Sequence, residues 1–285
     1  MLYFILGMGE SLRINFTKMV ASGNDFVVVE KSYELSAMSY RSLSKMICDR
    51  KYGIGADGLL ILEKSKIADI KMRIFNPDGS EAQMCGNGAR CVALFTSLKR
   101  KMQSAKPKIE TKAGIIESRV NGDNTRIKLT EPKDLKLDIP IRLSNRTLHV
   151  NFINTGVPHT VIFVEGIDEI DVCGIGRSIR YHKKFSPSGT NVNFVEVSSR
   201  ESVKIRTYER GVEDETLACG TGAVASVLVF ALKNNTRDKI NVYTKSKEIL
   251  GVYFKKQDSK FSNVWLEGRV RLVFKGEFRF RKDTL

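Results

Sequence analysis

The chain lacks the features of several protein classes. Its 285 residues include only three histidines and five cysteines, and no two cysteines have the C-x-x-C spacing of a zinc site, so we expect no metal site. An odd number of cysteines over so long a chain argues against a disulfide framework and favours a reducing, cytoplasmic setting. No apolar run approaches the roughly 18 residues of a membrane span, and the first residues lack the basic region and cleavage site of a signal peptide.

Acidic residues are scarce relative to basic ones. Aspartate and glutamate number 32 against 47 lysines and arginines, which gives a formal net charge of +15. Such a charge fits a nucleic-acid or membrane-surface partner, but the basic residues are scattered and form no RNA-binding, zinc-finger or polybasic-tail motif. The alternative is a basic solvated surface. We therefore expect no specific nucleic-acid partner and no membrane partner.

What the sequence does contain is an internal repeat, which bears on the whole fold. Residues 85–100 read CGNGARCVALFTSLKR, and residues 219–234 read CGTGAVASVLVFALKN. The match extends upstream, where IKMRIFN at 70–76 mirrors VKIRTYE at 203–209. The repeat predicts two similar halves, each with a cysteine at the start of an apolar helix. The second helix is so apolar that we expect it to be buried on most sides.

A cysteine at a helix N-terminus has distinctive chemistry. The free backbone N–H groups and the helix dipole lower the pKa of the thiol and bind an anion. Two such ends facing each other would place Cys85 and Cys219 as acid/base thiols around a bound carboxylate. The alternative is two ordinary helix-entry turns with structural cysteines, but two copies with matching flanks favour the functional interpretation. Cys48, Cys91 and Cys173 lack this context, and we interpret them as structural.

Strand patterns greatly outnumber helical ones, so we expect an α+β fold. Helical spacing covers 40–49, 175–181 and the segments from the repeat cysteines to about 101 and 234. Strands are expected at 14–29 (two, around a turn), 59–63, 70–75, 109–117, 125–130, 148–154, 160–164, 191–197, 203–208, 240–244, 248–255, 263–267 and 270–280. The predicted architecture is two pseudo-symmetric domains, each a mixed β-sheet rolled into a barrel around one central helix. The expected boundaries are 1–131, joined by the C-terminal strand at about 274–285, and 132–273.

Several longer motifs resemble those of diaminopimelate epimerase. They are FTKM at 16–19, GNDF at 23–26, NPDGSE at 76–81, MCGNGARC at 84–91, GVPH at 156–159, YERG at 208–211 and ACGTGA at 218–223. The resemblance runs from about Phe16 to Phe280. It implies an epimerase that needs no cofactor and that interconverts LL- and meso-diaminopimelate on the route to lysine and peptidoglycan.

The resemblance also implies roles for individual residues. Cys85 and Cys219 would be the two acid/base thiols, with Cys85 facing the proton of the LL isomer and Cys219 that of the meso isomer. Backbone N–H groups would bind the carboxylate at the reacting carbon, and a distal carboxylate and ammonium would meet Arg210 and Glu209. The carboxylate-binding residues would be Gly86, Asn87, Gly220 and Thr221, and the other substrate-binding residues Asn24, Asn76, Asn191, Glu209 and Arg210. His159 matches a motif residue near the active site. The oligomeric state stays open, with a homodimer as one option.

Three segments depart from the family pattern. Val20-Ala21-Ser22 replaces His-Gly-Leu, Gly58 stands where some members have glutamine, and Val157 stands where some have asparagine.

Other functions also stay open. Proline racemase-like enzymes use two cysteines, phenazine-pathway isomerases share the roll, and a basic RNA-binding protein could keep an epimerase scaffold. Glu209, Arg210 and both cysteines favour an epimerase acting on a long bis-amino acid.

Overall fold

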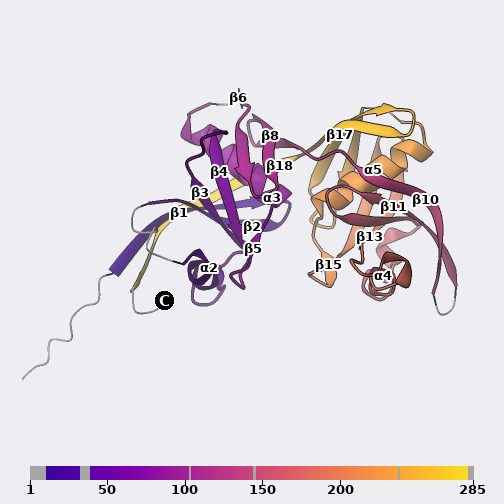
Figure 1. Ribbon diagram of the computed structural model, residues 1–285, viewed down its shortest axis with the longest axis horizontal. Coiled ribbons are helices and arrows are strands. Elements are labelled where there is room, and N and C mark those ends of the chain that lie inside the picture. Colours follow the sequence, from indigo (N-terminus) through magenta and orange to yellow (C-terminus); the bar gives the residue numbers. More distant parts are fainter. Residues whose placement is uncertain (1–10, 33–38, 103, 144–145, 237, 282–285) are drawn as a thin grey trace, which may run out of the picture.

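The computed structural model describes residues 11–32, 39–102, 104–143, 146–236 and 238–281 (Figure 1). Strands dominate this described part of the chain, and they form two mixed sheets, each rolled around one helix, as the sequence predicts. The helices are α2 (Tyr40–Cys48), α3 (Gly86–Lys99), α4 (Val172–Arg180) and α5 (Gly220–Lys233), with short 3₁₀ helices η1 (Ile167–Glu169) and η2 (Lys183–Phe185).

The first half contains nine strands. They are β1 (Ser11–Ala21), β2 (Asn24–Glu30), β3 (Gly58–Glu63), β4 (Ile70–Phe75), β5 (Glu81–Ala82), β6 (Ser104–Ala105), β7 (Lys108–Thr111), β8 (Gly114–Asn121) and β9 (Asn124–Lys128). β2 pairs with β3 in parallel, and β4 pairs with β7 in parallel. The other pairs are antiparallel, among them β1 with β2 and β3 with β4.

The second half repeats this plan. Its strands are β10 (Lys133–Arg142), β11 (Thr147–Asn154), β12 (Pro158–Phe163), β13 (Asn191–Ser199), β14 (Ser202–Glu209), β15 (Asp214–Thr216), β16 (Lys239–Tyr243) and β17 (Ile249–Gln257). β12 pairs with β13 in parallel, and β14 pairs with β16 in parallel. The same sequence of parallel and antiparallel pairs therefore occurs twice, which is the pseudo-symmetry that the repeat predicts.

One long strand, β18 (Lys260–Arg281), belongs to both halves and is the yellow ribbon that crosses the molecule in Figure 1. Its first part pairs with β17, to Gly251 opposite Glu267, and its last part pairs with β1 from Val270 opposite Ala21 onward. The prediction of two separate strands at 263–267 and 270–280 is therefore wrong, because backbone pairing continues through Gly268. β9 also pairs with β18 at positions 265–269. The domain boundaries stay a prediction.

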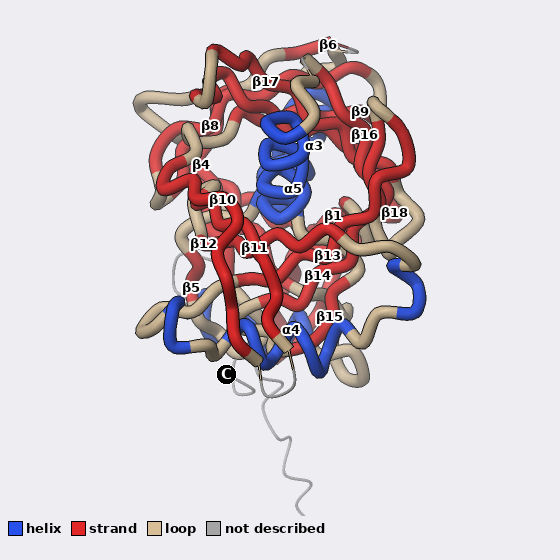
Figure 2. Tube along the Cα trace, turned by 90° about the vertical axis from the view of Figure 1, so that its right-hand side faces the viewer, coloured by secondary structure: helices blue, strands red, loops and turns tan. Residues whose placement is uncertain are grey.

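The two repeat helices lie inside the strands, as Figure 2 shows along the axis of the molecule. α3 contacts β1, β4, β8, β9 and β18, whereas α5 contacts β11 to β14, β17 and β18. Residues Asn87 to Leu94 of α3 and Gly222 to Ala231 of α5 are buried. The helices also contact each other. A helix buried on all sides has no polar face, which explains the unbroken apolar runs.

Two strand predictions need correction. The expected strand at 109–117 is two strands, because the Thr111 side chain bonds to the Ala113 N–H and the Gly114 carbonyl and turns the chain. β10 was not predicted, because most of its side chains are exposed and it carries no alternating apolar pattern. No helix in the described ranges is long and apolar enough to cross a membrane.

Candidate active site

Cys85 occupies the N-cap position of α3, directly before the first helical residue. Its extended backbone (φ −141°, ψ 124°) lets the sulfur accept a hydrogen bond from the Gly88 N–H at 3.5 Å. The thiol lies 3.9 Å from Asn24 Oδ1, and the Asn87 amide donates to the same oxygen at 3.4 Å. The turn between β1 and β2 therefore brings Asn24 to the start of α3, although the two are far apart in sequence.

Cys219 occupies the matching N-cap position of α5 and is buried. Its sulfur lies 3.5 Å from Thr221 Oγ1, which is 2.9 Å from His159 Nε2. The other ring nitrogen, Nδ1, lies 3.1 Å from the Asn193 amide. Burial lowers the pKa of His159 to about 3, and the charge of Arg210 acts in the same direction. His159 is therefore a neutral, fully hydrogen-bonded ring that positions Thr221 beside Cys219.

The pKa of both thiols differs from the expectation for a helix N-terminus. Burial raises the pKa of Cys85 and raises that of Cys219 to about 12. The backbone N–H groups of Gly88 and Gly222 do lower the pKa, as predicted, but burial outweighs them. In the structure without ligand, the prediction of a lowered thiol pKa is therefore wrong, and a thiolate must be favoured by something further.

Glu209 places a negative charge near both cysteines and raises the pKa of each. Burial raises the pKa of Glu209 itself, and its carboxylate accepts a hydrogen bond from Thr216 at 3.0 Å. A ligand cation beside it would relieve the repulsion between the carboxylate and the thiolates. The C-terminal end of β14 thus brings Glu209 near both Cys85 and Cys219.

Asn191 and Arg210 lie next to each other at the candidate site. The Asn191 side chain accepts from the Arg210 backbone N–H at 2.8 Å and donates to the Pro158 carbonyl at 3.0 Å. The Arg210 guanidinium donates to the Ser188 carbonyl at 3.0 Å. Within the described ranges it forms no ion pair, so its remaining donors are available to a ligand carboxylate.

Comparison with known proteins now decides the family. A sequence model of the diaminopimelate epimerase family matches residues 16–133 and 151–273. The chain belongs to the diaminopimelate epimerase family. Among curated members, it is 41% identical to the diaminopimelate epimerase of Caldanaerobacter subterraneus subsp. tengcongensis, over 93% of this chain and 99% of that protein. It is 42% identical to that of Aquifex aeolicus, over 92% of this chain and 97% of that protein.

Solved structures show the same fold at low sequence identity. A Bacillus anthracis phenazine biosynthesis protein of the PhzF family has a TM-score of 0.71 at 19% identity, covering 94% of this chain and 99% of its own. A hydroxyproline epimerase from Agrobacterium vitis has a TM-score of 0.70 at 13% identity, covering 94% of this chain and 92% of its own. These two structures show the fold, and the family match makes the chain an isomerase of the epimerase type.

Two departures from the diaminopimelate epimerase pattern have a structural reason. A side chain at Gly58 would put its Cβ 3.2 Å from the Phe75 carbonyl and 3.3 Å from the Phe26 ring, so a larger residue would require these neighbours to shift. Ser22 is buried with a left-handed backbone (φ 54°), and its hydroxyl accepts from Arg90 at 2.9 Å. The substituted turn is thus anchored by a contact that leucine could not make.

One predicted residue, Asn76, bonds within its own turn, and three residues near the site were not predicted. The Asn76 side chain bonds to Ser80 within its own exposed turn. Sequence reasoning missed Asp57, which accepts from the Asn24 amide at 2.9 Å, and Arg50, which pairs with Asp57 at 2.6 Å. It also missed Arg90, although a single arginine in an otherwise apolar helix is a visible signal.

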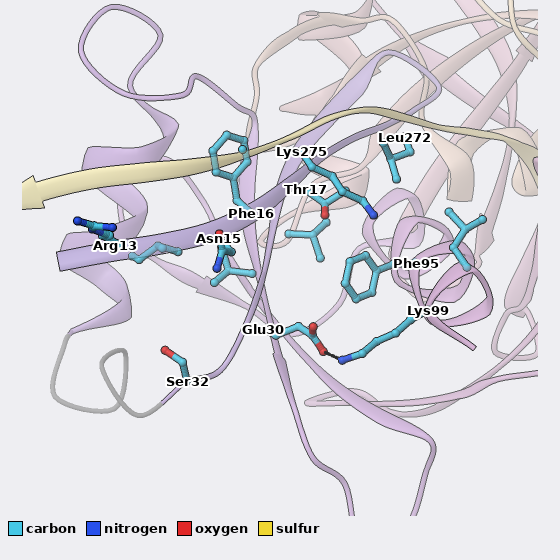
Figure 3. A pocket seen from close by; sticks show the side chains of 15 residues that line it. Arg13, Asn15, Phe16, Thr17, Glu30, Ser32, Phe95, Lys99, Leu272 and Lys275 are labelled. Atoms are coloured by element: carbon cyan, nitrogen blue, oxygen red, sulfur yellow. Dashed lines mark hydrogen bonds and ion pairs between the residues drawn. The ribbon is translucent and has the colours of Figure 1, made fainter. Parts of the chain in front are cut away.

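One groove lies away from this site. It has a volume of about 850 Å³ and lies along β1, β2 and β18 at the C-terminal end of α3, where Glu30 pairs with Lys99 (Figure 3). None of the predicted site residues lines it. The described residues contain no cluster of three or more histidine, cysteine, aspartate or glutamate side chains that could hold a metal ion.

Proposed function

We propose that the chain interconverts LL- and meso-diaminopimelate by a two-cysteine acid/base mechanism that needs no cofactor. One observation supports this above the others. Cys85 and Cys219 take the same N-cap position on two contacting, pseudo-equivalent helices, in a member of the diaminopimelate epimerase family. The route to lysine and peptidoglycan, and a cytoplasmic location, belong to the same proposal.

The proton balance requires the two thiols to be in opposite states. One cysteine, as thiolate, takes the α-proton and becomes a thiol; the other, as thiol, gives a proton to the opposite face and becomes a thiolate. Cys85 takes the proton of the LL isomer and Cys219 that of the meso isomer. After one turnover the two protonation states are exchanged, so the next turnover in the same direction requires proton exchange with solvent.

Binding of the substrate would change the charges around the two thiols, whose pKa is raised by burial and by Glu209. The backbone N–H groups at Gly86-Asn87 and Gly220-Thr221 point to the α-carboxylate, where negative charge develops as the proton leaves. Arg210 binds the distal carboxylate by its planar fork, and Glu209 receives an ammonium group. Asn24, Asn76 and Asn191 complete the substrate contacts in this proposal.

The test is exchange of the α-proton in D₂O, followed by NMR. We expect the wild-type protein to remove the α-proton signal of LL-diaminopimelate and to leave that of proline. Cys85→Ser and Cys219→Ser should each slow epimerisation by about 10²- to 10⁴-fold. Cys173→Ser, at an exposed cysteine bonded to Asp214, is the matched control and should keep wild-type activity. Near-normal turnover by either active-site variant would contradict the two-thiol mechanism.

A further inference from the structure

Arg90 is a fully buried cation next to the proposed site. It is the fifth residue of α3, and its exposed fraction is 0%. One guanidinium nitrogen, Nη2, donates to Asn87 Oδ1 at 2.7 Å and to Ser22 Oγ at 2.9 Å. The other two, Nε and Nη1, are buried without a hydrogen-bond partner. Within the described ranges, no carboxylate forms an ion pair with it, although Cys91 and the carboxylate of Glu248 act on its pKa from beyond ion-pair distance.

A buried, incompletely paired cation is destabilising, so its position needs an explanation. The guanidinium packs against β18 where the strand passes from one sheet to the other. A Cβ at Gly268 would lie 2.0 Å from Arg90 Nη1, so only glycine leaves room for the charge. Burial lowers the pKa of Arg90, but arginine stays protonated in proteins. The charge is therefore present and fixed in place.

The internal repeat shows that this charge has no counterpart. Arg90 follows Cys85 by five residues, and the residue five after Cys219 is Val224. Val224 is equally buried, among the apolar side chains of α5. Besides the different hydrogen-bond partners of the two sulfurs, the two helix starts therefore differ in the cation beneath one of them.

We propose that Arg90 is a positioning residue that makes the two thiols unequal: it holds Asn87 and the Ser22–Asn24 turn around Cys85, and its charge favours the thiolate on Cys85 over that on Cys219. The proposal rests on the proposed function, because only a two-thiol mechanism needs one of the two thiols ionised while the other is protonated. It also accounts for Ser22, since the serine hydroxyl gives the guanidinium its second partner.

The groups around each thiol support a thiolate that is more favourable on Cys85 than on Cys219. For Cys85, burial raises the pKa most and Glu209 raises it further, while the backbone N–H groups of Gly88 and Asn87 and, more weakly, the charge of Arg90 lower it. For Cys219, burial, Glu209 and Cys85 raise the pKa, and the hydroxyl of Thr221 and the N–H of Gly222 lower it. Asn24 Oδ1 favours the protonated form of Cys85, but at 3.9 Å this contact is weak.

The experiment measures alkylation of the two cysteines in the protein without substrate. Iodoacetamide reacts with the thiolate, and peptide mapping gives a separate rate for Cys85, Cys219 and the exposed Cys173. The wild type is compared with Arg90→Met, which removes the charge at similar volume, and with Arg90→Lys, which keeps it.

We expect the ratio of the Cys85 rate to the Cys219 rate at about pH 8 to fall about three- to tenfold in Arg90→Met. Arg90→Lys should keep most of the ratio, and the Cys173 rate should not change. A purely structural role for Arg90 predicts the opposite, because a loosened site reacts faster. An unchanged or increased ratio in folded Arg90→Met would overturn the proposal.

The wild type provides a test that does not depend on the variants folding. Its Cys85 rate, followed from about pH 6 to about pH 10, should level off at lower pH than its Cys219 rate. The reverse order, or two curves that rise in parallel over the whole range, would also overturn the proposal. None of these rates depends on turnover, so failure of α-proton exchange counts against the proposed function alone.

Discussion

His159 shows how one side chain links stability to the site. It is buried, it bonds to Thr221 and Asn193 through its two ring nitrogens, and its pKa falls to about 3. The neutral ring can serve both contacts, whereas a protonated ring would place a charge in a dry environment. The residue that orients Thr221 therefore also makes folding sensitive to pH.

The sign of this effect follows from proton binding. Between pH 6.5 and 3, an unfolded chain protonates residue 159 and the folded chain does not, so stability falls as pH falls. We expect this one group to lower the free energy of unfolding by about 2 kcal/mol between pH 7 and pH 5. Urea unfolding should show that loss in the wild type and not in His159→Asn.

The matched control for this prediction is His149→Asn, at an exposed histidine on β11. It should retain most of the pH dependence of the wild type. If His159→Asn keeps the full dependence as well, His159 is charged in the folded protein and its assigned contacts are wrong.

At the scale of the element, the two repeat helices differ in how tightly their first turns are packed. A Cβ at Gly222 would lie 2.3 Å from Asn193 Oδ1, whereas at the matching Gly88 the nearest atom is Leu60 Cδ2 at 3.2 Å. Asn193 also accepts from Thr207 and bonds to His159. The first-turn glycine of α5 thus faces a buried polar network, whereas that of α3 faces an apolar side chain.

The two glycines provide a matched pair of substitutions. Gly222→Ala should lower the free energy of unfolding by about 1–3 kcal/mol and slow α-proton exchange, because Asn193 must move and His159 with it. Gly88→Ala should lose less than about 1 kcal/mol, since the end of Leu60 can rotate away. Chemical denaturation of both variants tests this, and equal losses would show that Asn193 does not constrain α5.

At the scale of the whole molecule, β18 determines whether the halves fold alone. β1 pairs with β18 along its whole length, from Ser11 opposite Arg281 to Ala21 opposite Val270. The buried β1 residues Ile14, Phe16 and Met19 would lose this neighbour if the chain ended earlier. The first half therefore depends on the last part of the chain, and the central strand is a shared element.

Deletion of residues 270–285 tests this dependence. We expect the truncated protein to lose cooperative thermal unfolding, because β1 would become an edge strand that keeps its pairing with β2 but loses β18. Deletion of 282–285 is the control and leaves all of β18 in place, so it should unfold like the wild type. A truncated protein with a wild-type melting temperature would show that the pairing of β1 with β18 contributes little.

The net positive charge is a further property of the whole molecule. Many basic side chains are engaged in ion pairs, such as Arg73 with Glu81 and Arg206 with Glu215. The excess of +15 is spread over the chain, and the absence of a specific nucleic-acid partner stays a prediction. Any association through charge alone should weaken steeply as salt rises.

Local sequence determined most of the elements, the internal repeat and the placement of Cys85 and Cys219 at the starts of two helices. The cysteine-led apolar runs predicted α3 and α5 with nearly correct ends, because capping and burial of a helix are written in contiguous residues. The motifs named Cys85, Asn24, Asn87, Cys219 and Thr221 as site residues, and their roles stay a prediction. β10 escaped prediction because its exposed side chains leave no periodic signal.

Tertiary structure alone decided what depends on distant segments. The pKa of the two thiols is raised because the folded chain buries them, an effect that the sequence at a helix N-terminus does not reveal. β18 is continuous because pairing on either side of Gly268 comes from different sheets. Arg90 lies buried because Ser22, Asn87 and the missing side chain at Gly268 make room for it, and these three positions are brought together only when the chain folds.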